Sequence, residues 1–266
     1  MPYSDRYKVV FIHIPKTGGS SIEKALKLVP SDTWGTLDHF SGPNVEYFDN
    51  AQHLTFQQIK SDRPEWLKNA ETVLVAVRDP TDRIYSHFIA RKGQWLDKNR
   101  SYSSHRFILF IFLTVPLVKL CITLFGKYTR FIYPQYEHII PQHVYLDGLF
   151  KYSQSAPKKL LFISLFASTH GDAIKIVHSE IDSSIQIPHL RNSLSSSKVS
   201  QLRTRWTDRF IRYLYRSDYL LMHKISHLIN KAPAWCESFG YQLLTLNILH
   251  NPKCKSTGIG WQHLSL

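Results

Sequence analysis

The strongest constraint on the fold is an uninterrupted apolar run, ETVLVAV, at residues 71–77. A strand that is apolar at successive positions has both faces buried, which is typical of a parallel sheet covered by helices. Two further runs, KVVFIHI at 8–14 and KLLFISL at 159–165, also predict buried strands. Helical patterns lie between the runs, at 20–29, from Thr55 to Lys60 and from Thr81 to about Gly93. Strands that alternate with helices predict an α/β domain with a mainly parallel sheet.

The second half of the chain has fewer clear elements. PQHVYLDG at 141–148 predicts a brief strand or turn. The Ser-rich stretch 187–198 predicts a mobile loop, and the Ser-, Asp- and Gly-rich stretch 30–52 predicts a long loop. A strong helix is predicted from Val199, because apolar residues follow at helical spacing: Leu202, Trp206, Phe210 and Leu214. No repeat or interdomain linker is evident. We therefore expect one domain over 1–266, with an irregular tail at 232–266.

The charge balance favours polyanionic partners. The 266 residues carry a net charge of +13, which suits nucleic acid, phosphorylated or sulfated compounds, acidic polysaccharide or an anionic membrane surface. Three widely spaced cysteines, Cys121, Cys236 and Cys254, predict free thiols in a reducing compartment. The first residues are too polar for a signal peptide. A cytoplasmic location is favoured, with a Golgi or membrane-associated one as the alternative.

An apolar segment at 107–125, FILFIFLTVPLVKLCITLF, just reaches the length of a bilayer span. Lys119 places a charge inside it, and Pro116 is expected to break a helix near its middle. We expect a buried or amphipathic helical hairpin. Membrane contact through this segment is the alternative.

A glycine turn joins the first strand to the first helix, in the sequence PKTGGSS at 15–21. Such a turn exposes successive backbone N–H groups, and glycine lets a ligand approach them closely. The cation of Lys16 and the hydroxyls of Thr17, Ser20 and Ser21 complete a phosphate cradle with Gly18 and Gly19. A nucleoside-triphosphate P-loop would place the lysine after the glycines, and a Walker-B strand would end in a metal-binding Asp rather than in Arg78. The pattern therefore predicts a phosphate site without a metal.

A second motif, VRDPTDRIYSHF at 77–88, follows the clearest strand. Arg78 can hold a phosphate bidentately, and Ser86 lies in the helix that follows, where its hydroxyl could reach the same anion. A salt-bridged corner between strand and helix is the alternative for this motif alone.

The two motifs, in this order, resemble those of sulfotransferases that use 3′-phosphoadenosine 5′-phosphosulfate (PAPS). HIPKTGGSS is similar to the 5′-phosphosulfate loop and VRDPTDRIYSHF to the 3′-phosphate site. PQHVYLDG and IPHLRNS resemble later landmarks of the branch that contains heparan sulfate 2-O- and 6-O-sulfotransferases and bacterial members. The resemblance implies a P-loop-like, three-layer α/β/α fold with a central, mainly parallel sheet flanked by helices. It also implies metal-independent, in-line sulfuryl transfer from PAPS to a hydroxyl of a carbohydrate acceptor.

The resemblance assigns roles to the motif residues. The loop, Lys16 to Ser21, would hold the 5′-phosphate, and Lys16 would stabilise the leaving oxygen as negative charge grows on it. Arg78 and Ser86 would hold the 3′-phosphate, which distinguishes this donor from ATP.

The acceptor proton needs a general base, and His53 is our candidate. It lies between the two motifs, just before a helix capped by Thr55, and members of the resembled branch carry a catalytic histidine in a similar place. A surface loop histidine is the alternative interpretation. His39 is a weaker candidate base, Glu23 and Glu46 are weaker still, and His13 is expected to pack in the core.

A row of arginines follows the helical spacing near residue 210: Arg205, Arg209, Arg212 and Arg216. A solvated face is one interpretation, and a track for an anionic polysaccharide acceptor is the other. Two rival functions remain for the whole chain: an atypical nucleotide-dependent kinase, and a non-catalytic polyanion-binding protein. No nucleic-acid recognition motif is evident, so a nucleic-acid partner is not expected.

Overall fold

The computed structural model describes residues 3–28, 53–95, 138–155, 158–163, 170–188 and 203–230, together with 109, 112–117, 120 and 124. Its sheet has four strands in the order β1 (Tyr3–Ser4), β2 (Val9–Ile12), β3 (Thr72–Ala76) and β4 (Lys159–Ile163). β1 is antiparallel to β2, whereas β2, β3 and β4 run parallel. A mixed α/β fold with a sheet flanked by helices is thereby confirmed, while its P-loop-like, three-layer form stays a prediction.

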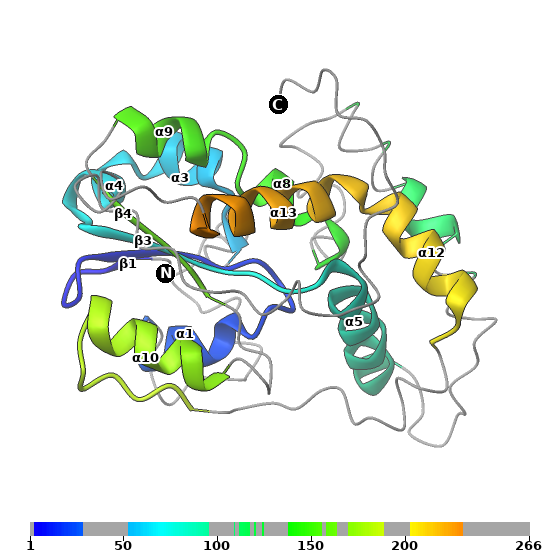
Figure 1. The fold of residues 1–266 in the computed structure, drawn as a ribbon, viewed down its shortest axis with the longest axis horizontal. Helices are drawn as coiled ribbons and strands as arrows, with labels where there is room; N and C mark the ends of the chain where they lie inside the picture. The colour runs from blue at the N-terminus through cyan, green and yellow to red at the C-terminus, as the bar shows by residue number, and fades with distance from the viewer. Residues whose placement is uncertain are drawn as a thin grey trace.

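Helices cover both faces of this sheet (Figure 1). One face packs against α1 (Gly19–Ala25) and α10 (His170–Glu180). The other face belongs to a larger cluster, to which the remaining helices contribute: α3 (Phe56–Asp62), α4 (Pro64–Asn69), α5 (Pro80–Trp95), α8 (Gln142–Tyr145), α9 (Leu149–Ser155), α12 (Arg205–Leu214) and α13 (Arg216–Asn230). The two faces arise because successive strand residues alternate, so Val9 and Phe11 join the first cluster while Val10 and Ile12 join the second.

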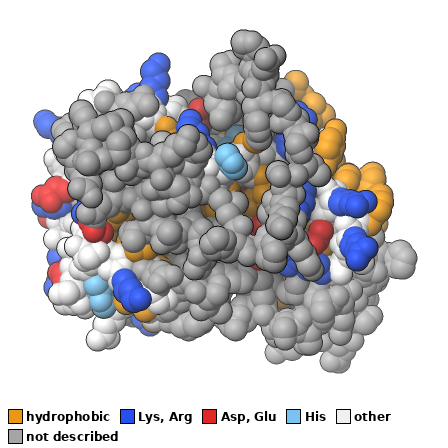
Figure 2. Space-filling model, viewed as in Figure 1, with side chains coloured by type: hydrophobic (Ala, Val, Ile, Leu, Met, Phe, Trp, Pro, Cys, Tyr) orange, Lys and Arg blue, Asp and Glu red, His pale blue; other side chains and the backbone are white. Residues whose placement is uncertain are grey.

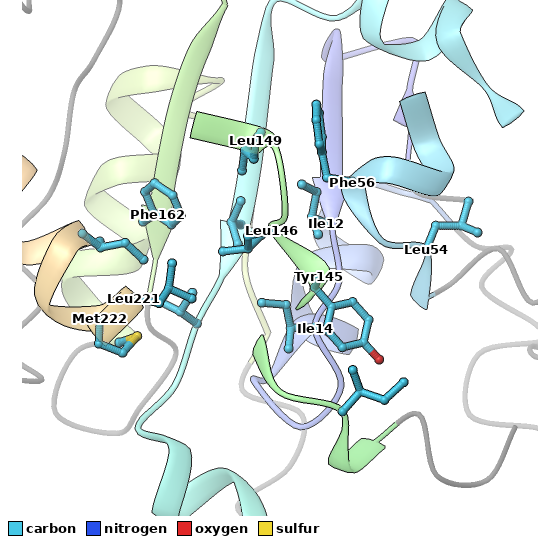
Figure 3. Close-up of a cluster of buried hydrophobic side chains, with 14 of the residues drawn as sticks. Ile12, Ile14, Leu54, Phe56, Tyr145, Leu146, Leu149, Phe162, Leu221 and Met222 are labelled. Carbon is cyan, nitrogen blue, oxygen red and sulfur yellow. The ribbon is translucent and has the colours of Figure 1, made fainter. Parts of the chain in front are cut away.

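The larger cluster joins elements from distant parts of the chain (Figure 3). Ile12 ends β2 and Ile14 follows it, Phe162 comes from β4, and Leu221 and Met222 come from α13. Each fully buried side chain of this size contributes about 1.5–3 kcal/mol relative to leaving it in water. The packing thus holds the ends of β2 and β3 in a fixed relation to α13.

The predicted cap at Thr55 is confirmed. The Thr55 hydroxyl accepts a hydrogen bond from the Gln58 backbone N–H at 3.2 Å, and the Gln58 side chain accepts one from the Thr55 N–H at 2.9 Å. This reciprocal pair is a capping box, which satisfies two backbone donors at the start of α3. The helix runs two residues beyond the predicted end, to Asp62.

For the strand or turn predicted at 141–148, the strand is wrong, because residues 142–145 form the short helix α8, and the turn is confirmed at 146–148. The buried carboxylate of Asp218 accepts hydrogen bonds from the backbone N–H groups of Gln142 at 2.8 Å and His143 at 3.0 Å. A carboxylate at a helix N-terminus satisfies donors that would otherwise lack partners. This stabilising contact comes from α13, so local sequence could not reveal it.

The helix predicted from Val199 begins later, at Arg205, after an N-cap at Thr204. Thr204 and Thr207 form a second capping box, with the Thr204 hydroxyl accepting from the Thr207 N–H at 3.1 Å. α12 ends at Leu214, and α13 starts at Arg216 as a separate helix. Residues 189–202 lie outside the described part of the chain, including most of the loop predicted at 187–198.

The apolar segment 107–125 differs from its prediction. Residues 112–117 are helical, so the break expected at Pro116 is wrong for this stretch. Val115 is buried in the core, but the large apolar side chains described around it are exposed, which contradicts a buried hairpin. Among the described residues, no helix combines the length and apolar character needed to cross a bilayer. Loop 30–52, tail 232–266 and the three cysteines lie outside the described residues.

Candidate active site

The site lies where two neighbouring parallel strands end. Ile12 of β2 is in register with Val75 of β3, so the segments that follow these strands leave the same edge of the sheet. The glycine turn follows β2, and Arg78 follows β3. Ligands of open α/β sheets bind outside the carboxyl ends of such strands. The topology therefore brings both sequence motifs to one place.

The turn has an unusual backbone at two residues. Lys16 has φ 68° and Gly18, the N-cap of α1, has φ 90°, both in the left-handed region. Such a conformation suits glycine but strains a lysine, and non-glycine residues held this way concentrate at functional sites. The N-cap Gly18 has no side chain, so it gives the N–H groups of the first turn of α1 no capping acceptor. Ser20 and Ser21 lie half-buried in that turn.

Thr17 does not match its predicted role as a hydroxyl donor to a ligand. Its side chain is buried, and the hydroxyl donates to the Ile14 carbonyl oxygen at 2.7 Å. A hydroxyl has one hydrogen to donate, and this one fastens the turn to the end of β2. The hydroxyl thus shapes the turn and leaves the Thr17 backbone N–H as its contribution to a phosphate cradle.

Arg78 contacts the glycine turn directly. Its Nη1 donates to the Lys16 carbonyl oxygen at 3.1 Å, across 62 positions of sequence. Gln142 holds the Arg78 backbone from both sides, since its amide oxygen accepts from the Arg78 N–H at 3.1 Å and its amide nitrogen donates to the Arg78 carbonyl at 2.8 Å. Burial lowers the pKa of Arg78 to about 10, so the guanidinium remains charged at neutral pH. It is a fixed, largely desolvated cation beside the turn.

Arg83 is a second cation beside the turn, which sequence reasoning missed. Its side chain is fully buried, with Nε donating to the Pro15 carbonyl at 2.8 Å and Nη2 to the His138 carbonyl at 3.0 Å. Within the described residues, Nη1 is buried without a hydrogen-bond partner. The signal that could have revealed Arg83 was its position in the same motif as Arg78, in the first turn of the helix that follows.

Four histidines form a cluster beside these cations: His13, His53, His87 and His138. The ring centroids lie 4.5 Å apart for His13 and His53, and 5.4 Å apart both for His53 and His138 and for His87 and His138. Burial, followed by the charges of His87, Lys16 and Arg83, lowers the pKa of His138 well below its usual value. Lys16 therefore acts electrostatically on this cluster.

His53 has the properties of a neutral base. It is 5% exposed, and its Nδ1 lies 3.1 Å from the His13 carbonyl oxygen. A carbonyl oxygen only accepts, so Nδ1 carries the ring proton and Nε2 keeps the lone pair. Burial first, and then the charges of His13 and His138, lower the pKa of His53 well below 6.5. Its burial contradicts the interpretation of a surface loop histidine.

His13 and Glu23 form a buried pair beneath the turn. His13 Nδ1 lies 2.8 Å from Glu23 Oε1, and both side chains are almost wholly buried. His13 is thus packed in the core as predicted, but it also lies against His53. Glu23 is occupied by this pair, which makes it unsuitable as the base for an acceptor. The two remaining candidate bases, His39 and Glu46, lie outside the described residues.

Gly19 is required by the His13 ring. A Cβ at this position would lie 2.1 Å from His13 Cδ2, far inside contact distance. We expect Gly19→Ala to lower the free energy of unfolding by about 1–3 kcal/mol, as forced overpacking does. His13→Ala alone removes the ring, so Gly19→Ala should cost much less in that background. Chemical denaturation of the four proteins measures this coupling; an equal cost of Gly19→Ala with and without the ring would contradict the contact.

The structure places Ser86 on the buried side of α5, where its side chain is 3% exposed. It lies between Arg83 and His87 on the helix that follows Arg78. Its contact with a 3′-phosphate stays a prediction.

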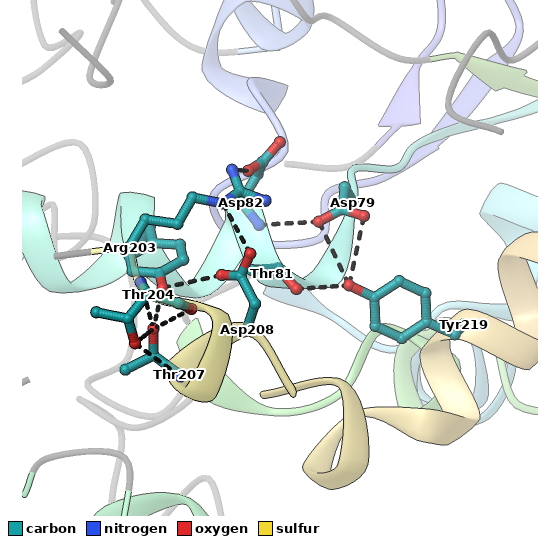
Figure 4. A network of polar contacts seen from close by, with 9 residues as sticks. Asp79, Thr81, Asp82, Arg203, Thr204, Thr207, Asp208 and Tyr219 are labelled. Atoms are coloured by element: carbon teal, nitrogen blue, oxygen red, sulfur yellow. Dashed lines mark hydrogen bonds and ion pairs between the residues drawn. The ribbon is translucent and has the colours of Figure 1, made fainter. Parts of the chain in front are cut away.

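The start of α5 is fixed by a polar network (Figure 4). Arg203 donates to Asp82 at 2.9 Å and to Asp208 at 3.0 Å, while the Tyr219 hydroxyl donates to Asp79 at 3.4 Å. These contacts tie the residues after Arg78 to α12 and α13. Burial raises the pKa of Asp79, whose carboxylate also accepts from the Asp82 N–H. Asp79 is therefore part of this network rather than an open carboxylate.

The four arginines predicted as one row do not lie on one helix. Arg205 and Arg209 are exposed on α12, but Arg216 begins α13. Arg212 is turned inward, with its Cζ 5.8 Å from the centre of the Tyr219 ring. The helix break at Tyr215 interrupts the row, and its role towards an acceptor stays a prediction.

The described residues also contain a basic cavity, but no group of metal ligands. A basic cavity of about 490 Å³ lies between α1 and the 184–188 segment, and Arg6, Lys24 and Lys27 line it. No group of three or more His, Cys, Asp or Glu in the described part of the chain is arranged to hold a metal ion. Metal-independent transfer stays a prediction.

Comparison with known proteins gives one finding. Residues 1–107 match the model of a family described as the sulfotransferase family. No curated protein and no solved structure matches the chain. The matched region contains the glycine turn, His53, Arg78 and Ser86, and the match supports sulfuryl transfer as the general activity.

Proposed function

We propose that this protein is a sulfotransferase that moves a sulfuryl group from PAPS to a hydroxyl of a carbohydrate acceptor. The observation that carries the proposal is the hydrogen bond from Arg78 to the Lys16 carbonyl, because it unites the two motifs at adjacent strand ends. The family match over residues 1–107 supports the reaction class. The donor and the acceptor class are our inference from the residues.

The charges around the turn fit a donor with two separated anionic groups. Arg78 is half-buried yet charged, and Nη1 of Arg83 lacks a hydrogen-bond partner among the described residues. A desolvated guanidinium gains most from a phosphate that it can hold through paired hydrogen bonds. In this proposal the turn and Lys16 hold the 5′-phosphosulfate, while Arg78 and Ser86 hold the 3′-phosphate.

The chain's own residues then act at both ends of the transfer. The acceptor oxygen forms a bond to sulfur as the bond between sulfur and the bridging oxygen breaks, and adenosine 3′,5′-bisphosphate leaves. His53 Nε2 takes the acceptor proton, since Nδ1 is engaged with the His13 carbonyl. Lys16 stabilises the negative charge on the departing oxygen. The contact between the His13 and Glu23 side chains holds His13 in place, and the His13 carbonyl in turn orients the His53 ring.

An anionic glycan is the proposed acceptor class, because the net charge of +13 favours association with polyanions. The specificity would reside in loops whose residues the structure does not describe. Transfer of radiolabelled sulfate from PAPS to a panel of glycans tests the proposal. Labelled glycan supports it, and a panel without any labelled product would contradict the carbohydrate acceptor.

The nucleotide-dependent kinase remains as the second candidate, and one observation disfavours it. The carboxylate nearest to a Walker-B position, Asp79, is half-buried and accepts hydrogen bonds from the Tyr219 hydroxyl and the Asp82 N–H. Labelled phosphate in the glycan product after incubation with ATP and Mg²⁺ would favour the kinase.

Arg78→Ala should weaken binding of adenosine 3′,5′-bisphosphate far more than binding of adenosine 5′-phosphate. Only the first ligand presents a 3′-phosphate, and a charged contact of this kind is worth about 1.5–3 kcal/mol, or roughly tenfold or more in affinity. Calorimetric titration of both ligands measures the difference, with Arg63→Ala at the end of α3 as the matched arginine control. Equal losses for the two ligands would remove Arg78 from the 3′ site.

A further inference from the structure

The helical apolar segment turns a stripe of leucines to solvent: Leu109, Leu113, Leu117, Leu120 and Leu124. Their exposed fractions run from 48% to 64%. All five are helical, and their spacings of 4, 4, 3 and 4 residues are those of one helix face, whereas Val115 follows Leu113 by two positions, on the opposite face, and is buried in the core. A soluble surface helix shows the reverse pattern, with polar residues outward. An exposed apolar stripe of this length marks an interaction surface.

Aromatic rings join this stripe to α12. Phe112 stacks on Phe210 at a centroid distance of 4.6 Å and on Trp206 at 6.3 Å, and Trp206 stacks on Phe210 at 5.8 Å. Trp206 is 58% exposed and Tyr213 is 69% exposed. The stacked rings make the leucine stripe and α12 one continuous surface.

Positive charge borders the same surface. Arg205 and Arg209 are exposed on α12, whereas the nearby carboxylate of Asp208 is paired with Arg203. Arg203 also pairs with Asp82, so both of these carboxylates are held in ion pairs with one arginine, whereas Arg205 and Arg209 point to solvent. Figure 2 shows hydrophobic side chains beside Lys and Arg side chains at the right edge of the molecule, where Figure 1 places α12.

We propose that the leucine stripe, Trp206, Tyr213, Arg205 and Arg209 form a docking surface for an anionic lipid bilayer. Leucines on one face enter the acyl boundary, exposed Trp and Tyr rings suit the headgroup level, and arginines pair with lipid phosphates. A polysaccharide would match the arginines but would leave the leucines in water. A lipid surface matches both parts, and the protein would lie on the bilayer rather than span it.

Co-sedimentation of the full chain with vesicles tests the proposal. Vesicles of phosphatidylcholine alone are compared with vesicles that also contain phosphatidylserine, each at low and high salt. Leu113→Ser/Leu117→Ser removes apolar surface without changing charge. Arg205→Gln/Arg209→Gln removes two cations, and Lys60→Gln/Lys68→Gln on α3 and α4 is the charge-matched control.

We expect binding to the phosphatidylserine vesicles that weakens with salt. Each surface variant should lose about tenfold or more in vesicle affinity, and the control should bind as the wild type does. Wild-type protein that binds neither kind of vesicle would overturn the proposal. So would arginine variants that lose transfer to a soluble glycan but keep vesicle binding, since those arginines would then serve the acceptor. A leucine variant that converts a dimer to a monomer in solution would assign the surface to a second copy of the chain.

Discussion

Lys16→Ala is expected to lower the rate of sulfuryl transfer by about 100-fold or more while the protein stays folded. Removal of one group that stabilises an oxyanion in the transition state typically has an effect of this size. The backbone at this position has φ 68°, which strains alanine as it strains lysine, so the substitution changes the side chain with little change in backbone strain. Transfer of labelled sulfate under saturating donor measures the rate.

Lys24→Ala is the matched control, since Lys24 is an exposed lysine of the short helix that follows the turn. It should transfer sulfate as the wild type does. Thermal unfolding of both variants shows whether the fold is kept. A Lys16→Ala protein that is folded and transfers at the wild-type rate would remove Lys16 from the reaction.

His53→Ala should lower turnover by about 100- to 10,000-fold, the usual loss when a general base is removed. Donor affinity should stay almost unchanged, because the base contacts the acceptor hydroxyl and not the nucleotide. His53→Asn keeps a donor for the His13 carbonyl but has no basic nitrogen, so it should fold better and be equally slow. Calorimetric donor binding and turnover are measured on the same preparations.

The pH dependence gives an independent readout for His53. Its pKa is lowered by burial and by the charges of His13 and His138, so the ring stays neutral at pH 6.5 and loses its lone pair to a proton only well below that. The wild-type rate should therefore persist through pH 6.5 and fall at lower pH. His223→Ala, an exposed histidine of α13, should keep this profile. A His53→Asn protein with normal turnover, or with parallel loss of donor binding, would contradict the assignment.

Sequence could predict that the glycine turn and Arg78 lie together, because strand order determines this part of the site. Two buried apolar runs ending in PKTGGSS and RDP had to meet at one sheet edge once both strands were parallel neighbours. The cap at Thr55 was also predictable, because a capping box is a local signal within four residues.

The contacts that sequence could not predict are long-range. α8 is a helix of four residues whose first two N–H groups donate to Asp218, 76 positions from Gln142. The histidine cluster gathers rings from separate segments, and Arg83 bonds to carbonyls of Pro15 and His138. No periodicity or spacing in the sequence predicts these long-range contacts, because each depends on how the helices pack on the sheet.

The prediction for the apolar segment was wrong in part, for a different reason. The sequence predicted a buried or amphipathic helical hairpin, and the exposed leucine stripe contradicts the buried form, because only Val115, among the described residues of the segment, is buried in the core. Hydrophobic periodicity locates an apolar face but does not say what covers it. Pro116 likewise lies within the helical residues 112–117. The expectation that proline breaks a helix applies to the interior of long helices, and it predicted a break here that the structure does not have.

Thermal unfolding in the presence of adenosine 3′,5′-bisphosphate, compared with ADP plus Mg²⁺, tests the central claim most directly, because it needs no acceptor. A ligand that binds only the folded state raises the unfolding midpoint, and at about 100 times its dissociation constant it contributes about 2.7 kcal/mol. We predict a clear rise with adenosine 3′,5′-bisphosphate that is lost in Arg78→Ala, and a smaller rise or none with ADP and Mg²⁺. Stabilisation by ADP and Mg²⁺ alone would contradict a site built for a 3′-phosphorylated donor.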